Sequence, residues 1–591
     1  MKRYVLIILL MGCLSQTVVA EVVKPDVAAR YAANLLGVSS VSVSDNNISR
    51  APGRGGVTAD PDYYVFNNPS GGWVIISAED RVTPIIGYSD TGSFETSGLP
   101  SNLKWWMDGV SESINKVREL DLEAPASVRR AWQDLSANRA PESTKKVLQT
   151  ANWDQEEPYT LYTPYVSGEN KHALVGCVAT AMSIIMRYYQ WPERGHGQIG
   201  GYTTTVYPTY IPAYSLDNHV YDWANMPLTD AAKKASAWTD TQLHEVAQLM
   251  YDCGVMVNMD YTFERGSASH EMRAVSALSE HMSYAESVTY MVRSLYTLDE
   301  WYALMKKEID EDRVILYGGY GDAGGHAFVC DGYDTDGSKL HINWGWGGAG
   351  NGFYTLDLTI TRNDGFPDEQ GAVIGIVPDT LKRDSEENEP FVLISRNGFF
   401  GMQPYEWADM KQGSELYFAF GWVYSNYTYE GDVDFKVCLM DKEGTIKQEG
   451  WTTTERIEKR SENYRAFITE KTALEVTPEL TDYFQLFRKT EGGSWRPVKG
   501  NRDLLPDVDG IYCGVLPYPV IIVPDDCSVG QTVKPTLTFG YLAVKSVSWK
   551  HNGKQIAGPE LTLTEGTNVI RADVVYIDGS KGSIVRSVTA K

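Results

Sequence analysis

The stretch that decides the fold reads HALVGCVATAMSIIMRYYQWP, from His172 to Pro192. Gly176 precedes the cysteine, Cys177, and an apolar, helix-forming run follows it until the proline ends the helix. Because this run is apolar almost all round, it predicts a buried central helix. A thiol in the first turn of a helix faces unpaired backbone N–H groups and the positive end of the helix dipole. Both favour the thiolate, so Cys177 is a candidate nucleophile.

A second motif follows far along the chain, where two glycines precede His326 and a strand-like apolar run follows it. The segment HINWGWGG, residues 341–348, comes next and contains Asn343 and Trp344. Alone, Cys177 is most often a buried structural cysteine. In papain-like enzymes, however, histidine and then asparagine follow the cysteine after about 130–150 residues. The order of the three residues therefore predicts a thiol hydrolase.

Each of these residues has a predicted role. His326 would take the thiol proton as a base and later protonate the leaving amine. The amide of Asn343 would orient the imidazole, and Trp344 would shield that hydrogen bond from water. A helical half that carries the cysteine and a strand-rich half that carries the histidine would then form the cleft of a papain-like fold.

Further segments resemble the streptopain family of secreted bacterial cysteine peptidases, members of the papain-like group. The resemblance covers 150–360 in order and rests on residues 153–159, 176–192, 259–261 with 266–268, 324–329 with 331–332, and 341–348. It implies that Gln155 supplies an oxyanion-hole donor and that Ser267 and Gly325 line the substrate cleft. It also implies an inhibitory prodomain, whose matching segments are residues 72–77 and 86–94.

Length, charge and motif content limit the class of protein. At 591 residues the chain is too long for one core, and its length suggests roughly four domains. A net charge of −24 argues against nucleic acid and anionic membranes as partners, since both demand a basic surface. No metal or cofactor is implied. His244-Glu245 lacks the second histidine of a zinc-protease helix, and the segment from Asp334 to Gly337 is typical of a hairpin turn rather than a calcium loop.

The seven cysteines are too sparse for a scaffold built on disulfides. Cys253 and Cys330 lie in apolar runs and are predicted to be buried. Cys438 with Cys513, or Cys513 with Cys527, could pair in an oxidising compartment, and the sequence leaves this pairing open.

The N-terminus has the pattern of a targeting segment. Residues 1–20 combine a basic start, a short apolar stretch and small residues before Glu21, which is typical of a secretory signal peptide. The apolar stretch is too short to span a bilayer, and no later segment is long enough. The chain is therefore expected to be secreted, extracellular or periplasmic. The segment from Leu10 to Cys13 loosely resembles a lipoprotein processing site, so an outer-membrane anchor through Cys13 is the weaker alternative.

The pattern of helices and strands predicts an α+β chain with separate β modules. The expected parts are the signal peptide 1–20, an inhibitory prodomain 21–146, a papain-like catalytic domain 147–380, a charged linker 381–390, a β-sandwich module 391–515 and an immunoglobulin-like β module 516–591. The last module has a probable hairpin turn at Asn552-Gly553. Cleavage of the prodomain is expected near Arg139 to Lys146, in a charged, proline-containing loop.

The function predicted from these features is a secreted cysteine endopeptidase made as a zymogen. It would act on protein or peptide substrates, without a cofactor, and its own prodomain would inhibit it. One alternative is an adhesin with an inert peptidase fold that binds through its β modules, although the intact set Cys177, His326 and Asn343 argues against decay. The other is a Cys–His amidase that acts on cell-wall peptides with similar geometry.

Overall fold

The computed structural model describes residues 22–590 with internal gaps. The segments outside the described residues are 1–21, 42–47, 51–59, 120–123, 139–144, 166–170, 218, 229–237, 264–265, 294–295, 322–323, 335–338, 357–368, 382–390, 394–401, 405–410, 426–430, 458–464, 480–481, 499–509, 513–519, 524–526, 539–543, 577–580 and 591. The predicted signal peptide, Cys13, Cys513 and nearly all of the linker therefore lie outside the described residues. Among the described residues, no helix is both long and apolar enough to cross a membrane.

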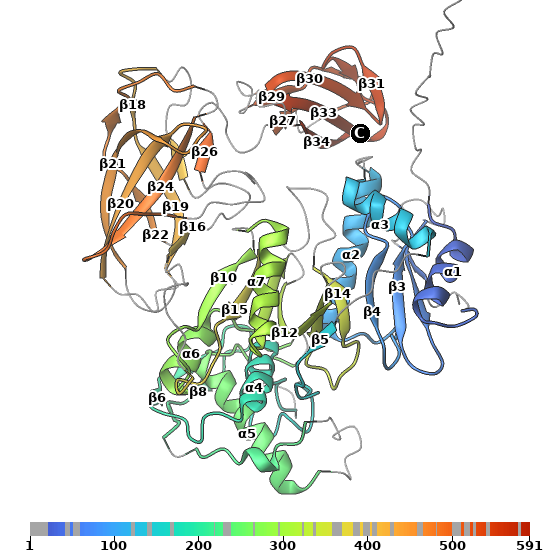
Figure 1. Cartoon of the computed structure of the whole chain (residues 1–591), viewed down its shortest axis with the longest axis vertical. Helices are drawn as coiled ribbons and strands as arrows, with labels where there is room; N and C mark the ends of the chain where they lie inside the picture. The colour runs from blue at the N-terminus through green and yellow to red at the C-terminus, as the bar shows by residue number, and fades with distance from the viewer. Residues whose placement is uncertain are drawn as a thin grey trace, which may run out of the picture.

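The N-terminal region packs helices on both faces of an antiparallel sheet (Figure 1). Its elements are helices α1 (Pro25–Leu35), α2 (Ser101–Glu119) and α3 (Ala126–Ser136), and strands β1 (Ile48–Arg50), β2 (Pro61–Asn67), β3 (Trp73–Ser77) and β4 (Ile85–Ser89). Along β2, Tyr64 and Phe66 pack with α1. Tyr63 and Val65 point to the other face and join the core that includes α2. This alternation follows from the two-residue period of a strand.

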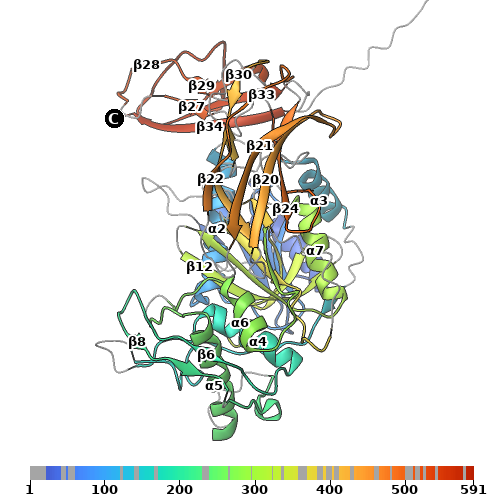
Figure 2. The same ribbon diagram turned by 90° about the vertical axis from the view of Figure 1, so that its left-hand side faces the viewer.

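The central region has helices first and strands later, as predicted. Its longer elements are α4 (Cys177–Tyr189), α5 (Asp240–Met256), α6 (Arg273–His281), α7 (Leu298–Asp310), β5 (Lys145–Val147), β10 (Thr289–Val292), β11 (Ile315–Gly321), β12 (Gly324–Asp334), β13 (Lys339–Asn343), β14 (Gly352–Thr355) and β15 (Glu369–Ile374). Short pieces lie between α4 and α5: β6 (Gln198–Ile199), β7 (Tyr202–Thr203), β8 (Tyr210–Ile211), β9 (Tyr214–Ser215) and the 3₁₀ helix η2 (Trp223–Asn225). Figure 2 shows α4, α5 and α6 gathered together at one end of this region.

Helix α4 is the centre of the core. Every residue from Cys177 to Met186 is buried, which confirms the prediction of a central helix from its all-round apolar pattern. The helix packs against α5 and against β12, the strand that carries His326. Cys253 and Cys330 are fully buried in the same core, as predicted. The arrangement of a helical half against a sheet is the mixed α+β architecture expected for a papain-like peptidase.

One sheet runs through both regions. Its eleven strands follow the order β1-β2-β3-β4-β14-β13-β12-β11-β15-β10, with β5 paired to β12. The two regions meet where Tyr88 of β4 pairs with Phe353 of β14, and Gly87 with Tyr354. A Cβ atom at Gly87 would lie 2.8 Å from the Tyr354 ring, so the strands approach this closely because the glycine has no side chain.

Strand β5 corrects the prediction that the segment up to Lys146 is a loop. Lys145 to Val147 pairs with Gly332 to Asp334 of β12. A Cβ atom at Gly332 would lie 2.5 Å from the carbonyl oxygen of Lys146, so this glycine permits the pairing. Sequence patterns miss the strand because it is short, charged and at a sheet edge, where lysines are common. Residues 139–144, where cleavage is expected, lie outside the described residues.

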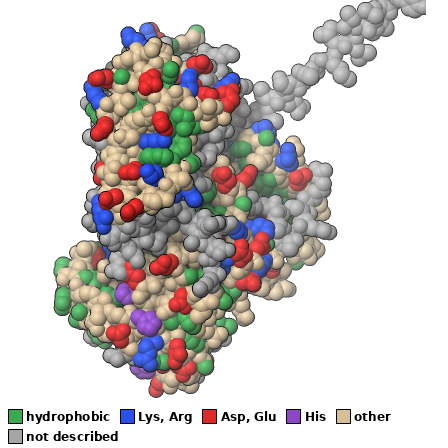
Figure 3. All heavy atoms as spheres, turned by 60° about the vertical axis from the view of Figure 1, so that its left-hand side comes forward, with side chains coloured by type: hydrophobic (Ala, Val, Ile, Leu, Met, Phe, Trp, Pro, Cys, Tyr) green, Lys and Arg blue, Asp and Glu red, His purple; other side chains and the backbone are tan. Residues whose placement is uncertain are grey.

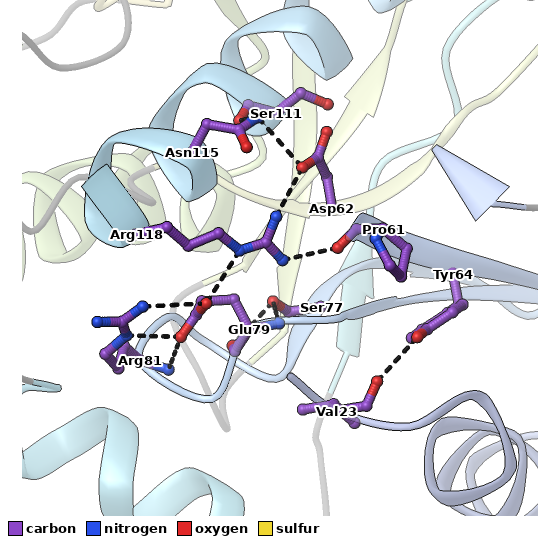
Figure 4. A network of polar contacts seen from close by, with 10 residues as sticks. All are labelled: Val23, Pro61, Asp62, Tyr64, Ser77, Glu79, Arg81, Ser111, Asn115 and Arg118. Carbon is purple, nitrogen blue, oxygen red and sulfur yellow. Dashed lines mark hydrogen bonds and ion pairs between the residues drawn. The ribbon is translucent and has the colours of Figure 1, made fainter. Parts of the chain in front are cut away.

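A charged network holds α2 to the N-terminal sheet (Figure 4). Arg118 of α2 donates to Asp62 and Glu79 at 3.0 Å each and to the Pro61 carbonyl at 2.6 Å. Both carboxylates are almost completely buried. Burial works to raise the pKa of the Glu79 carboxyl, but Arg81 and Arg118 outweigh burial, and this pKa lies below its ordinary value. The network therefore fixes the helix whose other end reaches the candidate active site.

The C-terminal residues form separate, all-β sheets (Figure 1, orange and red). Their strands are β16 (Phe391–Leu393), β17 (Met402–Pro404), β18 (Glu415–Leu416), β19 (Phe418–Ser425), β20 (Gly431–Met440), β21 (Ile446–Ile457), β22 (Arg465–Ile468), β23 (Thr472–Ala473), β24 (Tyr483–Thr490), β25 (Arg496–Pro497), β26 (Gly510–Tyr512), β27 (Val520–Ile522), β28 (Thr532–Val533), β29 (Thr536–Thr538), β30 (Val544–His551), β31 (Lys554–Ile556), β32 (Leu561–Thr562), β33 (Gly566–Tyr576) and β34 (Lys581–Ala590). The predicted hairpin turn at Asn552-Gly553 is present, with positive φ at both residues. The immunoglobulin-like character of the last module stays a prediction, as do the domain boundaries.

Candidate active site

Cys177 is placed by the glycine that precedes it. Gly176 has φ of 96°, a conformation that L side chains rarely adopt. A Cβ atom there would lie 2.6 Å from the sulfur of Met259 and 2.9 Å from the carbonyl oxygen of Ser267. Conformation and space therefore both require glycine at this position. The chain turns sharply here into α4, so the thiol lies at the helix N-terminus, where the backbone N–H groups are unpaired.

The structure brings the strand of His326 against this thiol. Burial raises the pKa of the Cys177 thiol, while a hydrogen bond from the backbone N–H of Ala327 works in the opposite direction. Ala327 directly follows His326 in β12, so the two candidate catalytic residues come from neighbouring elements. Burial also lowers the pKa of the His326 imidazole to about 4. At neutral pH both groups are therefore uncharged in this structure.

Helix α2 of the N-terminal region lies against His326. The Trp105 ring lies 5.3 Å from the His326 ring, centroid to centroid, and the side chain is 8% exposed. On the next residue, the Trp106 ring lies 6.0 Å from the Trp344 ring. The Asn102 amide donates to the Trp344 carbonyl at 2.7 Å. These residues carry no catalytic motif, and the adjacent tryptophans on an otherwise polar helix are the sequence signal that indicates them.

Asn343 has a different partner from the one predicted. Its Nδ2 donates to Thr150 Oγ1 and to the Ala151 carbonyl, both at 3.0 Å. Its Oδ1 accepts from the Gly345 N–H at 3.1 Å. Both amide protons are thus used on the segment that follows β5, and the predicted hydrogen bond to the imidazole is not formed between these described residues. The reason is register: Asn343 pairs with Val329, which lies beyond the histidine in β12.

Trp344 lies close to the strand that carries the histidine. It is 1% exposed, and its ring lies 4.8 Å from that of Phe328 in β12. Its Nε1 donates to the Gly350 carbonyl at 3.1 Å, which fixes the indole. The residue therefore forms part of the apolar wall beside His326, and its predicted role as a shield stays a prediction.

Gln155 lies beside the segment that leads to the nucleophile. Its backbone carbonyl accepts from the Val175 N–H at 3.1 Å, two residues before Cys177. The Asp154 carboxylate accepts from the backbone N–H of Gln155 at 2.7 Å and from that of Glu156 at 3.3 Å, which forms a local turn. The Gln155 side chain is buried, with 3% of the residue exposed. This position is compatible with an oxyanion-hole donor.

Ser267 is tied to the segment before the nucleophile, and Gly325 lies on the strand that carries His326. The Ser267 hydroxyl donates to the Leu174 carbonyl at 2.6 Å and accepts from the Thr262 N–H at 2.9 Å. This hydroxyl therefore ties its loop to the segment before Cys177, and its own carbonyl is the group that borders Gly176. Gly325 belongs to β12, pairs with Tyr320 of β11 and is half-buried.

A further residue near the thiol was missed by the sequence analysis. The carboxylate of Glu271 is buried, and its charge adds to the effect of burial in raising the pKa of Cys177. No sequence motif indicates this residue, because it precedes a short helix in an ordinary polar segment. Only the tertiary structure, in which the loop after Ser267 lies against β11, shows where Glu271 is placed.

The chain is similar to known protein families and to individual proteins. A model described as the Peptidase C10 family matches residues 153–354, and one described as Spi protease inhibitor matches residues 20–114. The thiol protease/hemagglutinin PrtT of Porphyromonas gingivalis is 33% identical over 329 residues, which are 54% of this chain and 37% of that protein. Streptopain of Streptococcus pyogenes is 33% identical over 349 residues, 55% of this chain and 83% of streptopain. A solved fragment of Prevotella intermedia prointerpain A is 25% identical with a TM-score of 0.43, covering 56% of this chain and 98% of the fragment.

These matches bear on the sequence predictions. The chain spans 37% of the length of PrtT but 83% of streptopain, at the same identity. The predicted resemblance to the streptopain family and the predicted class, a cysteine peptidase, are confirmed at the level of the family. The inhibitor match, residues 20–114, contains α1, the strands β1 to β4 and most of α2, which agrees with an inhibitor-like prodomain. The chain belongs to the peptidase C10 family.

Proposed function

We propose that this protein is a cysteine endopeptidase made as a zymogen, with Cys177 as nucleophile and His326 as its base. The observation that carries the proposal is the thiol at the start of a buried helix, in contact with the strand that presents His326. The thiolate attacks a peptide carbonyl, and the imidazolium gives its proton to the leaving amine. Water then loses a proton to the imidazole, attacks the thioester and releases the acyl group.

The oxyanion of each tetrahedral intermediate needs hydrogen-bond donors that are already in place. We assign this role to the backbone N–H of Cys177 and the side-chain amide of Gln155. The backbone carbonyl of Gln155 accepts a hydrogen bond from the Val175 N–H. One such donor is worth about 10²–10³ in rate in other hydrolases. Ser267 and Gly325 would border the bound substrate from the two sides of the nucleophile. Trp344 would shield the imidazole from water. For Asn343 to orient the imidazole, its amide would have to exchange Thr150 and the Ala151 carbonyl for the His326 ring.

The same proposal assigns inhibition to residues 21–146. Helix α2 covers His326 with Trp105, and burial keeps both the thiol and the imidazole uncharged. Release of the helix would rehydrate the imidazole and allow the thiolate–imidazolium pair to form. The released enzyme would be residues 147–380, with or without the linker and the modules 391–515 and 516–591, to which we assign no ligand.

We also propose secretion, from the signal-peptide pattern of residues 1–20, with lipidation at Cys13 as the weaker alternative. The site needs no cofactor in this mechanism. N-terminal sequencing of the protein recovered from culture medium would locate the mature start, expected near Arg139 to Lys146. A mature start that retains residues 21–138 would contradict removal of the prodomain.

A thiol-trapping epoxide tests the function directly. The activated protein should be labelled at Cys177, lose activity in proportion to labelling, and cleave casein but not peptidoglycan. His326→Ala should lose nearly all activity and the wild-type pH profile of labelling. Absence of both labelling and casein cleavage would favour the inert adhesin, and labelling with cleavage of peptidoglycan alone would favour the cell-wall amidase.

A further inference from the structure

The segment that leads from β5 to Gln155 has no regular secondary structure of its own. Residues 148–154, all of which the structure describes, belong to no helix and no strand, so bonds to other parts of the chain must fix their course. The Leu148 N–H donates to the Asp331 carbonyl at 2.8 Å, and the Trp153 carbonyl accepts from the Gly347 N–H at 2.9 Å. The position of Gln155 at the end of this segment therefore depends on contacts with the strand-rich half of the catalytic region.

Side chains bind the middle of this segment. Thr150 Oγ1 donates to Asp331 Oδ2 at 2.5 Å and accepts from Asn343 Nδ2 at 3.0 Å. The same Nδ2 donates to the Ala151 carbonyl at 3.0 Å. Asp331 and Asn343 both bind the Thr150 hydroxyl, and together they hold the chain shortly before it reaches Gln155.

The carboxylate of Asp331 is fixed from two sides. Figure 3 shows many acidic side chains at the surface of the molecule, where water solvates them, but Asp331 is 2% exposed. A buried carboxylate needs hydrogen-bond donors in place of water. The Thr150 hydroxyl is one donor, at Oδ2, and the His341 imidazole is another, from Nδ1 to Oδ1 at 2.5 Å. Each carboxylate oxygen therefore has a donor, which fixes the carboxylate and, through it, the threonine hydroxyl.

These bonds do not depend on the prodomain. Every residue that forms them lies within 148–347, inside the expected catalytic domain 147–380, so cleavage between residues 139 and 146 leaves all of them in the mature chain. The bonds also use the amide protons of Asn343. While they last, the imidazole of His326 receives no hydrogen bond from this amide.

We propose, on the basis of the peptidase function above, that Asp331 and Thr150 are positioning residues of the oxyanion hole. They act through the segment 148–154, which they hold in the course that brings the Gln155 amide to the oxyanion. Such a donor must lie within hydrogen-bond distance of the developing charge, and a displacement of about 1 Å can cost roughly 10²-fold in rate. Asn343 is then a further anchor of this segment and not a partner of the imidazole.

The test measures kcat, KM and the alkylation of Cys177 in activated enzyme prepared from the full chain. Asp331→Asn keeps the shape of the side chain but replaces one acceptor oxygen, and Thr150→Val removes the hydroxyl at nearly constant size. We expect each to lower kcat roughly tenfold with little change in KM, because the donor acts mainly in the transition state. Thr150→Ser, which restores the hydroxyl, should recover most of the loss. Asp299→Asn, at an exposed aspartate of α7, is the control and should keep the wild-type kcat.

Alkylation shows whether the thiol and its base are disturbed. Iodoacetamide should label Cys177 of both variants at the wild-type rate and with the wild-type pH profile, because alkylation needs no oxyanion hole. A shifted pH profile would show that the pair acts through His326, and it would overturn the proposal.

A double-mutant cycle identifies the group through which the pair acts. In a Gln155→Ala background, Asp331→Asn should have no further effect on kcat, because the donor that it positions is already absent. An equal loss in both backgrounds overturns the proposal, and so does an unchanged kcat in the folded single variants. If Asp331→Asn fails to fold, Thr150→Val and Thr150→Ser carry the same comparison. Failure of the activated wild-type protein to cleave any peptide refutes the peptidase function itself.

Discussion

The N-terminal and catalytic regions share one sheet, yet different contacts hold them. Around α4, ten consecutive residues from Cys177 to Met186 are buried, and apolar packing against α5 and β12 dominates. On the N-terminal side, Arg118 ties α2 to buried carboxylates of the same region. That region meets the catalytic region through two residue pairs between β4 and β14 and through aromatic contacts such as that of Trp106 with Trp344. A short strand junction and its side-chain contacts can be exchanged for water, whereas the buried helix α4 cannot leave without unfolding. We therefore expect the N-terminal region to dissociate after cleavage while the catalytic region stays folded.

Removing the nucleophile should have the largest effect. Cys177→Ala is expected to abolish casein cleavage while the melting temperature stays close to that of the wild type, because one sulfur is lost and little else. If maturation is autocatalytic, this variant should accumulate as the uncut proenzyme. Trimming of the pure variant at the normal rate would instead identify an outside protease, and residual cleavage of casein would contradict the assignment of the nucleophile.

Breaking the charged network should weaken the N-terminal region selectively. Arg118→Met leaves Asp62 and Glu79 buried without their shared partner, which costs about 3–5 kcal/mol. In the Cys177→Ala background, limited proteolysis should cut residues 22–138 faster, while fragments of the catalytic region persist. Arg130→Met, a change at an exposed arginine of α3, should leave the digestion pattern unchanged. Equal loss of both regions would show that they unfold as one unit.

Gln155→Ala tests the proposed oxyanion-hole donor in the catalytic region. The amide would bind the charged intermediate better than the neutral carbonyl, so its loss should lower kcat more than it raises KM. We expect a loss of roughly 10²–10³ in kcat, with alkylation of Cys177 at a nearly normal rate. A variant with the wild-type kcat would make Gln155 a structural residue only.

Trp105→Ala should loosen inhibition without changing the mature enzyme. The aromatic contact with His326 is worth about 0.5–1.5 kcal/mol beyond the area it buries. We therefore expect iodoacetamide to label Cys177 of the proenzyme roughly tenfold faster, since about 1.4 kcal/mol corresponds to a factor of ten. Lys104→Ala, at an exposed neighbour on α2, serves as the control. Equal labelling rates for the two variants would remove Trp105 from the inhibitory contact.

Lower pH should have the smallest effect, an increase in the labelling of Cys177 in the proenzyme. The imidazole of His326 has a pKa of about 4 in the proenzyme, below its ordinary value of 6.5. Between these values the opened form binds more protons, so the closed form is fully stable above about pH 6.5 and weakens as pH falls towards 4. Labelling of Cys177, corrected for the intrinsic pH dependence of a free thiol, should rise about threefold from pH 7 to pH 6. His326→Ala should lose this rise, and a rise that persists would point to other groups.

Several elements of the site could be read from local patterns. The helix that starts at Cys177 was predicted to end before Pro192, and it ends at Tyr189, because an apolar run bounded by Gly176 and Pro192 has few other solutions. The strand of His326 was predicted from its apolar run after two glycines. Strand β5 and Glu271 were missed, because a three-residue edge strand and a single polar residue carry no periodic signal.

The sequence by itself determined the order of the candidate catalytic residues, the central helix and the family. These depend on local propensity, on apolar periodicity and on motifs of contiguous residues. Only the tertiary structure decided that Trp105 covers His326, that the Asn343 amide binds Thr150 and the Ala151 carbonyl, and that Glu271 faces Gly318. Each of these contacts joins segments far apart in the chain. Strand register and close packing select them from many alternatives that the same local patterns allow.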